Sequence, residues 1–334
     1  MHNDNSQIMV SICCITYQHE KYIQNALDGF LMQKTNFKFE ILIHDDASTD
    51  DTVNIINHYQ TLYPDIIIPV FQSVNQYSQG KRISAEFLYP LAKGKYIAVC
   101  EGDDFWTDDS KLQYQIDFLE DHPEYIGITH NVNILNELDN EINCDKQLYG
   151  EKVDSIYTLK DFIDGRCVAG QFCSFVFKNF FTKKILEKVR LKDFPGTNHI
   201  ELSFWLVIQG DVYYSGRVMA THRFIKKRGS CNWTSQALTK NQFGYLYDLF
   251  PRLEKMAIDE FGKKVNLNKC KEAHFSQMVR RYLKTLKRSD LRVLFETWKK
   301  TGFCIKYLYL IFYTPIFDIA FLVWKKLKLI TKYC

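Results

Sequence analysis

The sequence predicts an α/β fold in which helices flank a mainly parallel sheet. Over residues 9–104, apolar runs of strand length alternate with segments of helical periodicity, which is typical of a parallel sheet. The runs are continuously apolar instead of alternating with polar residues, as expected for strands buried on both faces. Residues 236–300 have a helical pattern, so we also expect a helical C-terminal extension.

Each expected element has a local signal in the sequence. The expected strands cover residues 9–17, 39–48, 65–72, 95–104, 125–135, 173–179 and 212–224. The expected helices cover residues 25–33, 49–63, 84–94, 111–121 and 199–210. Thr49 or Asp50 is the expected N-terminal cap of the second helix. Gly94 and Gly210 are expected to end the third and the fifth helix.

Composition limits the class of protein. The 334 residues are 46% hydrophobic and 25% charged, which is ordinary for a globular protein with one large or two modest domains. The formal net charge of +4 is too small to indicate a nucleic-acid partner. The ten cysteines are scattered without zinc-type spacing, and no secretory signal is evident at the N-terminus. We therefore expect a reducing, cytoplasmic location.

Acidic residues gather where three expected strands end. The segments TYQHE (16–20), HDDAS (44–48) and EGDDFW (101–106) should meet at one edge, because ligands of open α/β sheets bind at the carboxyl ends of the strands. Such a cluster either binds a hard divalent cation or consists of solvated helix caps. We interpret Asp50 and Asp51 as solvated helix caps. We interpret Asp103 and Asp104 as part of a cation site, because these acids would repel each other without a compensating cation.

Phosphate binding at this edge would need a metal ion. The sequence has neither the GxGxxG pattern nor the GxxxxGK[ST] pattern after its first strand, so glycine-rich phosphate loops of the dehydrogenase and P-loop types are excluded. If phosphates bind here, a divalent metal in place of a glycine-rich loop must neutralise their charge.

Three blocks in order, VSICCITYQHEKYIQNALDGFLMQ, FEILIHDDASTDDTVNII and AKGKYIAVCEGDDFWTDDSKLQYQIDFLE, resemble the family 2 glycosyltransferases of bacterial cell-surface polysaccharide synthesis. The resemblance is strong over 8–122, weaker over 123–225 and absent after about 240. It implies a GT-A fold and a hexosyltransferase that inverts the sugar configuration. It further implies a nucleotide-sugar donor, most often a UDP-sugar, and a saccharide or lipid-linked saccharide acceptor.

The resemblance assigns roles on the nucleotide side. Thr16, Tyr17 and Glu20 match positions that line the nucleotide base and ribose. Asp45 and Asp46 match paired acids, one of which typically hydrogen-bonds the uracil.

The resemblance also assigns a metal site. Glu101-Gly102-Asp103 occupies the DxD position, where Glu101 replaces the commoner Asp and Asp103 is the expected ligand of a divalent metal cofactor (Mg²⁺ or Mn²⁺). The residues that follow are expected to shape the sugar and acceptor pocket: Asp104, Phe105 and Trp106. Arg223 matches an arginine that lies near the phosphates.

The catalytic base departs from the family pattern. Counting back from Gly210, the usual acid position falls on His199, and the nearest carboxylate is Glu201. Either His199 or Glu201 is the base, with Glu201 the first choice, or Glu201 is only a favourable acid at a helix N-terminus. If His199 is the base, the acidic limb of the pH–rate profile is expected near the usual imidazole pKa of about 6.5. Arg82 is a weaker candidate for a nucleotide contact, with ordinary loop polarity as the alternative.

The C-terminal tail poses a separate question. The apolar stretch 307–324 is long enough to span a bilayer, but Pro315 and Asp318 near its centre argue against a span. Its aromatic and lysine-rich composition instead favours contact with a membrane surface through 302–334; packing on the catalytic domain or another subunit is the alternative.

The expected organisation is a GT-A domain over 1–235 and a helical extension over 236–334. Within the GT-A domain, 1–122 form the nucleotide-sugar half and 123–235 the acceptor half. Two other functions stay open. The protein could be a catalytically silent scaffold that binds nucleotide sugars, because the position of the base is unusual. A sugar nucleotidyltransferase is disfavoured, because the glycine-rich loop that it needs is missing.

Overall fold

The computed structural model describes residues 7–136, 141–143, 154–181, 199–224 and 245–285. Its strands are β1 (Ile8–Thr16), β2 (Lys38–Asp45), β3 (Ile67–Phe71), β4 (Tyr96–Glu101), β5 (Phe105–Trp106), β6 (Tyr125–Asn136), β7 (Glu141–Asn143), β8 (Ser155–Tyr157), β9 (Val176–Lys178) and β10 (Asp211–Phe224). Its α-helices are α1 (Ile23–Leu31), α2 (Thr52–Leu62), α3 (Lys111–Asp121), α4 (Leu159–Ile163), α6 (His199–Val207), α8 (Tyr245–Phe261) and α9 (Asn268–Thr285). Short helical turns are η1 (Tyr77–Gln79), η2 (Ser84–Leu88), η3 (Tyr89–Leu91) and η4 (Phe172–Ser174).

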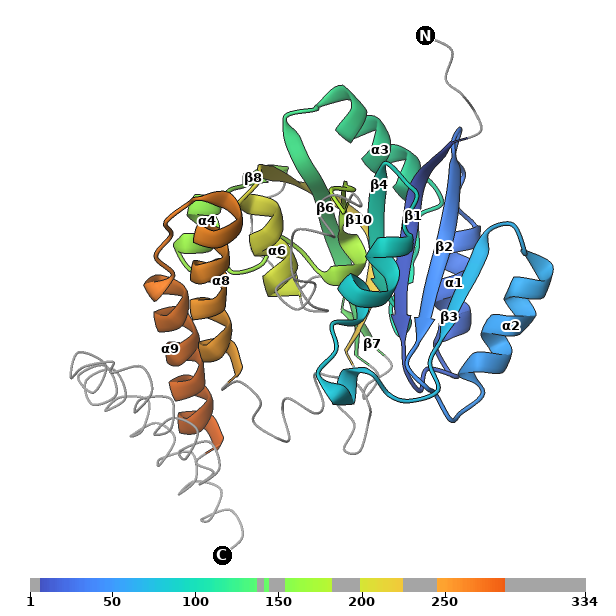
Figure 1. The fold of residues 1–334 in the computed structure, drawn as a ribbon, viewed down its shortest axis with the longest axis horizontal. Coiled ribbons are helices and arrows are strands. Elements are labelled where there is room, and N and C mark those ends of the chain that lie inside the picture. Colours follow the sequence, from blue (N-terminus) through green and yellow to red (C-terminus); the bar gives the residue numbers. More distant parts are fainter. Residues whose placement is uncertain (1–6, 137–140, 144–153, 182–198, 225–244, 286–334) are drawn as a thin grey trace, which may run out of the picture.

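The described strands form one mixed sheet in the order β3-β2-β1-β4-β9-β6-β10-β5, with β7 and β8 attached to β6 and β10 (Figure 1). Strands β1 to β4 pair in parallel, as the sequence predicts. Beyond β4 the sheet departs from this pattern, because β9 runs antiparallel to both β4 and β6. Strands β6 and β10 are parallel, and β5 pairs antiparallel with the end of β10.

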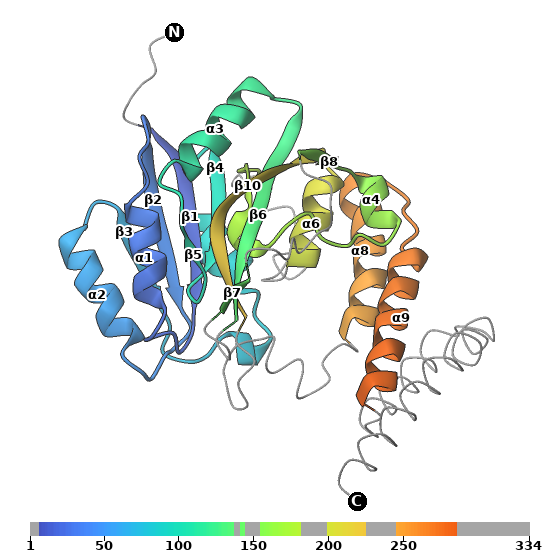
Figure 2. The same cartoon turned by 180° about the vertical axis from the view of Figure 1, so that it is seen from behind.

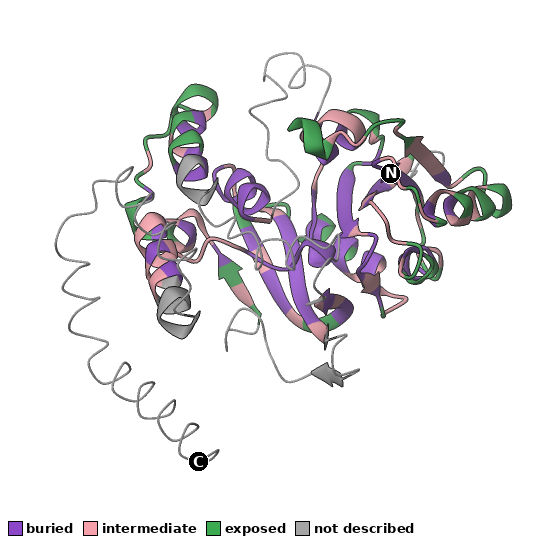
Figure 3. Ribbon diagram, turned by 90° about the horizontal axis from the view of Figure 1, so that it is seen from below, coloured by how far each residue is buried: buried purple, intermediate pink, exposed green. Residues whose placement is uncertain are grey.

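Apolar side chains are buried on both faces of the sheet. In β1, Ile12 and Cys14 belong to the core beneath α1 and α3, whereas Cys13 between them belongs to the core on the opposite face, as the alternation of side chains along a strand requires. Helices α1 and α2 cover the first face over the parallel strands, as the view from behind shows (Figure 2). The burial colouring shows the sheet buried between exposed outer helix faces (Figure 3), which explains the continuous apolar runs.

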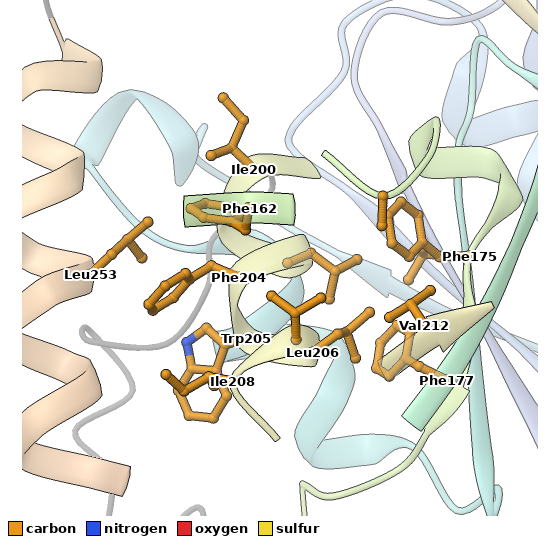
Figure 4. Packing of buried hydrophobic residues seen from close by; sticks show 14 of the residues in the cluster. Phe162, Phe175, Phe177, Ile200, Phe204, Trp205, Leu206, Ile208, Val212 and Leu253 are labelled. Carbon is orange, nitrogen blue, oxygen red and sulfur yellow. The ribbon is translucent and has the colours of Figure 1, made fainter. Parts of the chain in front are cut away.

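On the second face, the C-terminal helices α8 and α9 share one apolar core with α4 and α6. Phe204 of α6 lies 5.0 Å from Phe162 of α4 between ring centroids, and both belong to one cluster with Leu253 of α8 and Cys270 of α9 (Figure 4). The Cys270 thiol lies 2.9 Å from the Phe162 carbonyl oxygen. Helices α8 and α9 are therefore packed against α4 and α6 through apolar side chains. The boundary at 235 stays a prediction.

The helix expected over 84–94 is wrong in type. The chain forms the π-helical turn η2 followed by the 3₁₀ turn η3, because Pro90 cannot continue a regular α-helix. Gly94 lies beyond these turns and is needed for a different reason. A Cβ at Gly94 would lie 2.4 Å from the Ser11 amide nitrogen, so only glycine lets this segment approach β1.

The expected cap of α2 is displaced by one residue. The N-cap position is Asp51, whose side chain makes no capping bond. Asp50 instead accepts hydrogen bonds from the Thr52 amide (3.1 Å) and hydroxyl (2.5 Å) through its Oδ1 atom. Asp50 therefore stabilises the helix start from a position just outside it.

Several expectations concern the remaining residues. The tail 302–334 lies outside the described residues. Among the helices that the structure does describe, none is both long and apolar enough to cross a membrane. The described cysteines, Cys13, Cys14, Cys100, Cys167, Cys173 and Cys270, are all free thiols.

Candidate active site

The three acidic segments meet at one edge of the sheet, as predicted. Thr16 at the end of β1 lies opposite Asp45 of β2, and Ile15 lies opposite Glu101 of β4. The Asp46 amide donates to the Thr16 carbonyl at 3.1 Å, which extends the pairing past the strand ends. We call the residues gathered here the strand-end cluster: Thr16, Asp45, Asp46, Glu101 and Asp103.

The loops that follow β1 and β2 are bonded to each other and locally strained. Gln18 and Ala47 both have positive φ angles, 57° and 64°, a conformation that side chains other than glycine rarely adopt and that often marks functional sites. The Gln18 amide donates to Ser48 Oγ at 2.8 Å. These bonds hold both loops in place at the edge of the sheet.

The two aspartates after β2 bind protein groups. Asp45 accepts hydrogen bonds from the Ser48 amide (2.9 Å) and hydroxyl (2.5 Å). Burial raises the pKa of Asp45, and the bonds from Ser48 oppose this effect. Asp46 accepts from the amides of Gln76 (2.7 Å) and Tyr77 (3.0 Å). Both carboxylates therefore shape the loops around the edge, and their contact with a nucleotide base stays a prediction.

The other nucleotide-side residues differ in exposure. Tyr17 is half-buried and Glu20 is exposed. Glu20 Oε2 accepts from the Asp51 amide at 3.2 Å. Thr16 is buried, and its Oγ1 lies 3.1 Å from Nδ1 of His19.

The Glu101-Gly102-Asp103 segment turns tightly against β1. The Gly102 amide donates to the Ile15 carbonyl at 2.9 Å. A Cβ at this position would lie 2.8 Å from Thr16 Oγ1, so glycine is required. Burial raises the pKa of Glu101 well above its usual range, and the adjacent charges of Asp103 and Asp104 raise it further.

These residues are suited to hold a metal ion that is also coordinated by the phosphates of a bound substrate. Among the described residues, no three His, Cys, Asp or Glu side chains form a group able to hold a metal ion by themselves. Asp103 is buried, and its Oδ2 lies 3.9 Å from His19 Nε2. Mg²⁺ typically takes one or two carboxylates together with substrate phosphates and water. The crowded acids at Glu101 and Asp103 match such a site.

The end of β10 brackets the acidic segment from the other side. Asp104 Oδ1 accepts from the Arg223 amide at 2.8 Å and lies 3.0 Å from His222 Nδ1. Arg223 Nε donates to the Asp103 carbonyl at 2.9 Å. Burial alone would lower the pKa of His222, but the negative charge of Asp104, with smaller effects from Asp103 and Glu101, raises it to about 9. His222 is therefore a cation at neutral pH.

Trp106 is fixed by groups that the sequence reasoning did not single out. Its Nε1 donates to the Cys173 carbonyl at 3.0 Å, and its ring lies 4.7 Å from Phe30. The fully buried Lys111 places its Nζ 3.9 Å from the Trp106 ring centroid and 2.7 Å from Gln115 Oε1. Burial lowers the pKa of Lys111 to about 7.

The two candidate bases lie on the first turn of α6 in different surroundings. Burial, together with a smaller effect from the nearby charge of His222, lowers the pKa of His199 to about 4. His199 is therefore a neutral imidazole at physiological pH, and an acidic limb near 6.5 is no longer expected. Glu201 is buried between two arginines: Arg82 donates to its Oε2 at 2.7 Å and Arg252 to its Oε1 at 3.4 Å. We call the residues around α6 and the end of β10 the α6–β10 side: His199, Glu201, His222 and Arg223.

The sequence contains signals for three residues that were not predicted from it. His19 lies three residues after Thr16 in the first acidic segment, within the loop that follows β1. Lys111 and Gln115 are four residues apart on α3, a spacing that places them on one face of a helix. Sequence alone cannot tell that this face is buried.

Comparison with known proteins gives consistent results. The family model described as glycosyl transferase family 2 matches residues 11–180. The uncharacterized protein Rv1520 of Mycobacterium tuberculosis is 42% identical over 128 residues, which cover 38% of this chain and 36% of that protein. The Escherichia coli protein named UDP-Glc:alpha-D-GlcNAc-diphosphoundecaprenol beta-1,3-glucosyltransferase WfaP is 36% identical over 112 residues, 34% of this chain and 41% of that protein. Each match thus spans well under half of the relative.

Structural similarity extends further along the chain. The structure of S. aureus TarS 1-349 in complex with UDP-GlcNAc superposes with a TM-score of 0.62 at 15% sequence identity, covering 87% of this chain and 79% of that one. At this identity the similarity shows the fold alone. It confirms the expected GT-A architecture.

Proposed function

Because the chain belongs to glycosyl transferase family 2, we propose that it transfers one sugar, with inversion, from a UDP-sugar to a saccharide or lipid-linked saccharide acceptor. The observation that carries the proposal is the convergence of three strand ends into the strand-end cluster, with the α6–β10 side next to it. The names of the relatives support the substrate classes. WfaP is named for UDP-Glc and a diphosphoundecaprenol-linked sugar, and TarS was solved with UDP-GlcNAc.

On the donor side, Asp103 would hold a divalent cation, with Glu101 beside it. When bound, Mg²⁺ or Mn²⁺ neutralises charge on the leaving diphosphate. The positive charge of His222, which is 3.0 Å from Asp104, acts in the same direction. The proposed nucleotide position is at the ends of β1 and β2, where it would be lined by Thr16, Tyr17, Glu20, Asp45 and Asp46. Arg223, which donates to the Asp103 carbonyl, would shape the sugar side, and the buried Trp106 would support that side from within the core.

On the acceptor side, a base must take the hydroxyl proton while that oxygen attacks the anomeric carbon and the bond to the diphosphate breaks. We propose His199 for this role. Its neutral imidazole has a lone pair available at physiological pH, and a bound diphosphate would raise its proton affinity. Glu201 is the alternative, but both of its oxygens already accept from arginines.

The test is a panel of nucleotide sugars incubated with the full chain, Mn²⁺ or Mg²⁺, and saccharide or lipid-linked acceptors. Release of UDP, slow without an acceptor and faster with one, supports the proposal. Donor binding without turnover supports the scaffold alternative, and pyrophosphate release from a nucleotide triphosphate and a sugar phosphate supports a nucleotidyltransferase.

The proposal includes peripheral membrane contact through 302–334, outside the described residues. Such contact would bring the site to a lipid-linked acceptor. Flotation of the full chain with anionic vesicles, compared with a chain ending at residue 301, tests it. Equal flotation of both chains would contradict this part of the proposal.

A further inference from the structure

We propose that Glu201 is a positioning residue, which fixes His199 by pairing with Arg82 and Arg252. This inference rests on the proposed function and deepens it. It assigns roles to two arginines from distant parts of the chain, one in the loop before η2 and one on α8.

The strength of the two pairs differs. Arg82 and Glu201 have side chains that are only 15% and 5% exposed, and their N–O distance is 2.7 Å, so this is a short, charge-assisted bond in a largely buried setting. Arg252 is 54% exposed and 3.4 Å from Glu201. Exposed pairs contribute little. The bond to Arg82 is therefore the main one.

Arg82 is itself held in place by its own loop. The Arg82 amide donates to Glu86 Oε1 at 2.9 Å, and Lys81 Nζ donates to Glu86 Oε2 at 3.1 Å. Glu86 lies in the π-helical turn η2, which contacts β1 and β2. The network therefore connects the strands of the strand-end cluster with the first turn of α6.

Helix α6 needs such a directional bond. From Ile200 to Val207 every residue is buried, and Phe204 packs beside Phe162 and Leu253 (Figure 4). A helix that is buried on all sides has no single apolar face to select its rotation, so directional bonds add to the packing that orients it. The Ser203 hydroxyl donates to the His199 carbonyl at 2.6 Å and accepts from the Ala169 amide at 2.9 Å, so it joins the helix to the segment that follows α4. The pair with Arg82 relates the first turn, and hence His199, to the rest of the site.

The same contacts argue against Glu201 as the base. Taking up a proton would remove the negative charge that compensates Arg82 in a largely buried site, and an uncompensated buried charge is costly. Burial and the charge of His222 also oppose a proton on His199, but the negative charge of a bound diphosphate would offset that cost.

The experiment is a double-mutant cycle of Glu201→Gln and Arg82→Gln, with kcat, donor KM and pH–rate profiles measured for each variant. We expect each single change to lower kcat by about 10- to 100-fold, the loss of an oriented base, with donor KM within about threefold and the limbs of the pH profile unmoved. Because the two residues act as one unit, the double variant should resemble either single variant. Arg252→Gln should cost less, about two- to fivefold.

Glu254→Gln is the matched control. Glu254 is also an ion-paired glutamate, 2.9 Å from Lys271, but it joins α8 to α9 away from the first turn of α6. This variant should lower thermal stability and leave kcat unchanged. Multiplicative losses in the Glu201/Arg82 double variant, or near-normal Arg82→Gln beside inactive Glu201→Gln, would overturn the inference and return Glu201 to the role of base.

A second readout separates this inference from the proposed function. In histidine-labelled protein, the His199 imidazole signal, assigned by its loss in His199→Asn, should shift or broaden in Glu201→Gln and in Arg82→Gln and stay in place in Glu254→Gln. An unmoved signal in both site variants refutes the positioning role whether or not the protein transfers sugar. Conversely, a wild-type protein without any turnover refutes the proposed function, while the signal still tests the geometry.

Discussion

The strand-end cluster and the α6–β10 side meet at Asp103 and Asp104 but are assembled in different ways. The cluster uses residues at the ends of neighbouring parallel strands, so Thr16, Asp45 and Glu101 are brought together by the strand register itself. The α6–β10 side instead depends on contacts between distant segments, such as Arg82 with Glu201 and Asp104 with His222. A site that follows from register tolerates local changes, whereas one built from long-range ion pairs depends on each partner.

The largest effect is expected on the strand-end cluster itself. Asp103→Ala removes the proposed metal ligand, and the lost charge stabilisation amounts to several kcal/mol, or a rate loss on the order of a thousandfold. Turnover as a function of Mn²⁺ concentration measures it. Asp109→Asn, a change in an exposed carboxylate paired with Lys34, is the control. Near-normal turnover of Asp103→Ala in EDTA would exclude the metal assignment.

Next comes the base on the α6–β10 side. His199→Asn should lower transfer by about 10²- to 10⁴-fold while UDP binding persists, since general-base catalysis contributes in this range. Because burial and the charge of His222 lower the pKa of His199 to about 4 in the free enzyme, wild-type kcat/KM should stay level through pH 6.5 and fall only nearer pH 4. Undiminished transfer by His199→Asn would remove this residue from the mechanism, and a limb of kcat/KM near 6.5 would contradict the lowered pKa.

The His222–Asp104 pair should appear in the pH dependence of stability. Its folded pKa of about 9 exceeds the unfolded value of 6.5, so the stabilisation is fully present below about pH 6.5 and is lost as pH rises through 9. The difference in unfolding free energy between wild type and His222→Gln should therefore shrink, by on the order of 1–3 kcal/mol, over this range. Urea unfolding of metal-free protein measures it.

The unfolding free energy of wild type must be compared with that of His222→Gln at each pH, because another buried group also makes stability depend on pH. Burial lowers the pKa of Lys111 to about 7, and this group acts in the opposite direction, adding stability as pH rises from 7 toward 10.5. A pH-independent gap between wild type and His222→Gln would show that His222 is not a cation in the folded state.

The smallest effect is expected within the strand-end cluster. Ser48→Ala removes the hydroxyl that donates to Asp45 at 2.5 Å and accepts from the Gln18 amide at 2.8 Å, and it leaves the bond from the Ser48 amide to Asp45, so about 1–2 kcal/mol of stability should be lost. Denaturant unfolding at neutral pH checks it. A loss as large as that of a core truncation would mean that the strand-end cluster is as sensitive to single partners as the α6–β10 side.

Some features of the fold can be predicted from the sequence and others cannot. Apolar periodicity predicts β1, β2 and β4 and the edge that their acids share, because parallel strands bury both faces and end together. It fails at 84–94, where helical periodicity is present but Pro90 and the close approach at Gly94 produce turns. Apolar periodicity also does not predict that Lys111 is buried beside Trp106, because tertiary packing determines which side chains are buried.

The sequence by itself determined the parallel strands, the acids at their ends and the resemblance to a family, since all three depend on residues close together in the chain. Tertiary structure decided the antiparallel insertion of β9, the charge of His222, the neutrality of His199 and the ion pairs of Glu201. Each of these depends on which groups lie within a few ångströms across long sequence separations. Electrostatic interactions change steeply over such distances, so spacing along the chain carries little information about them.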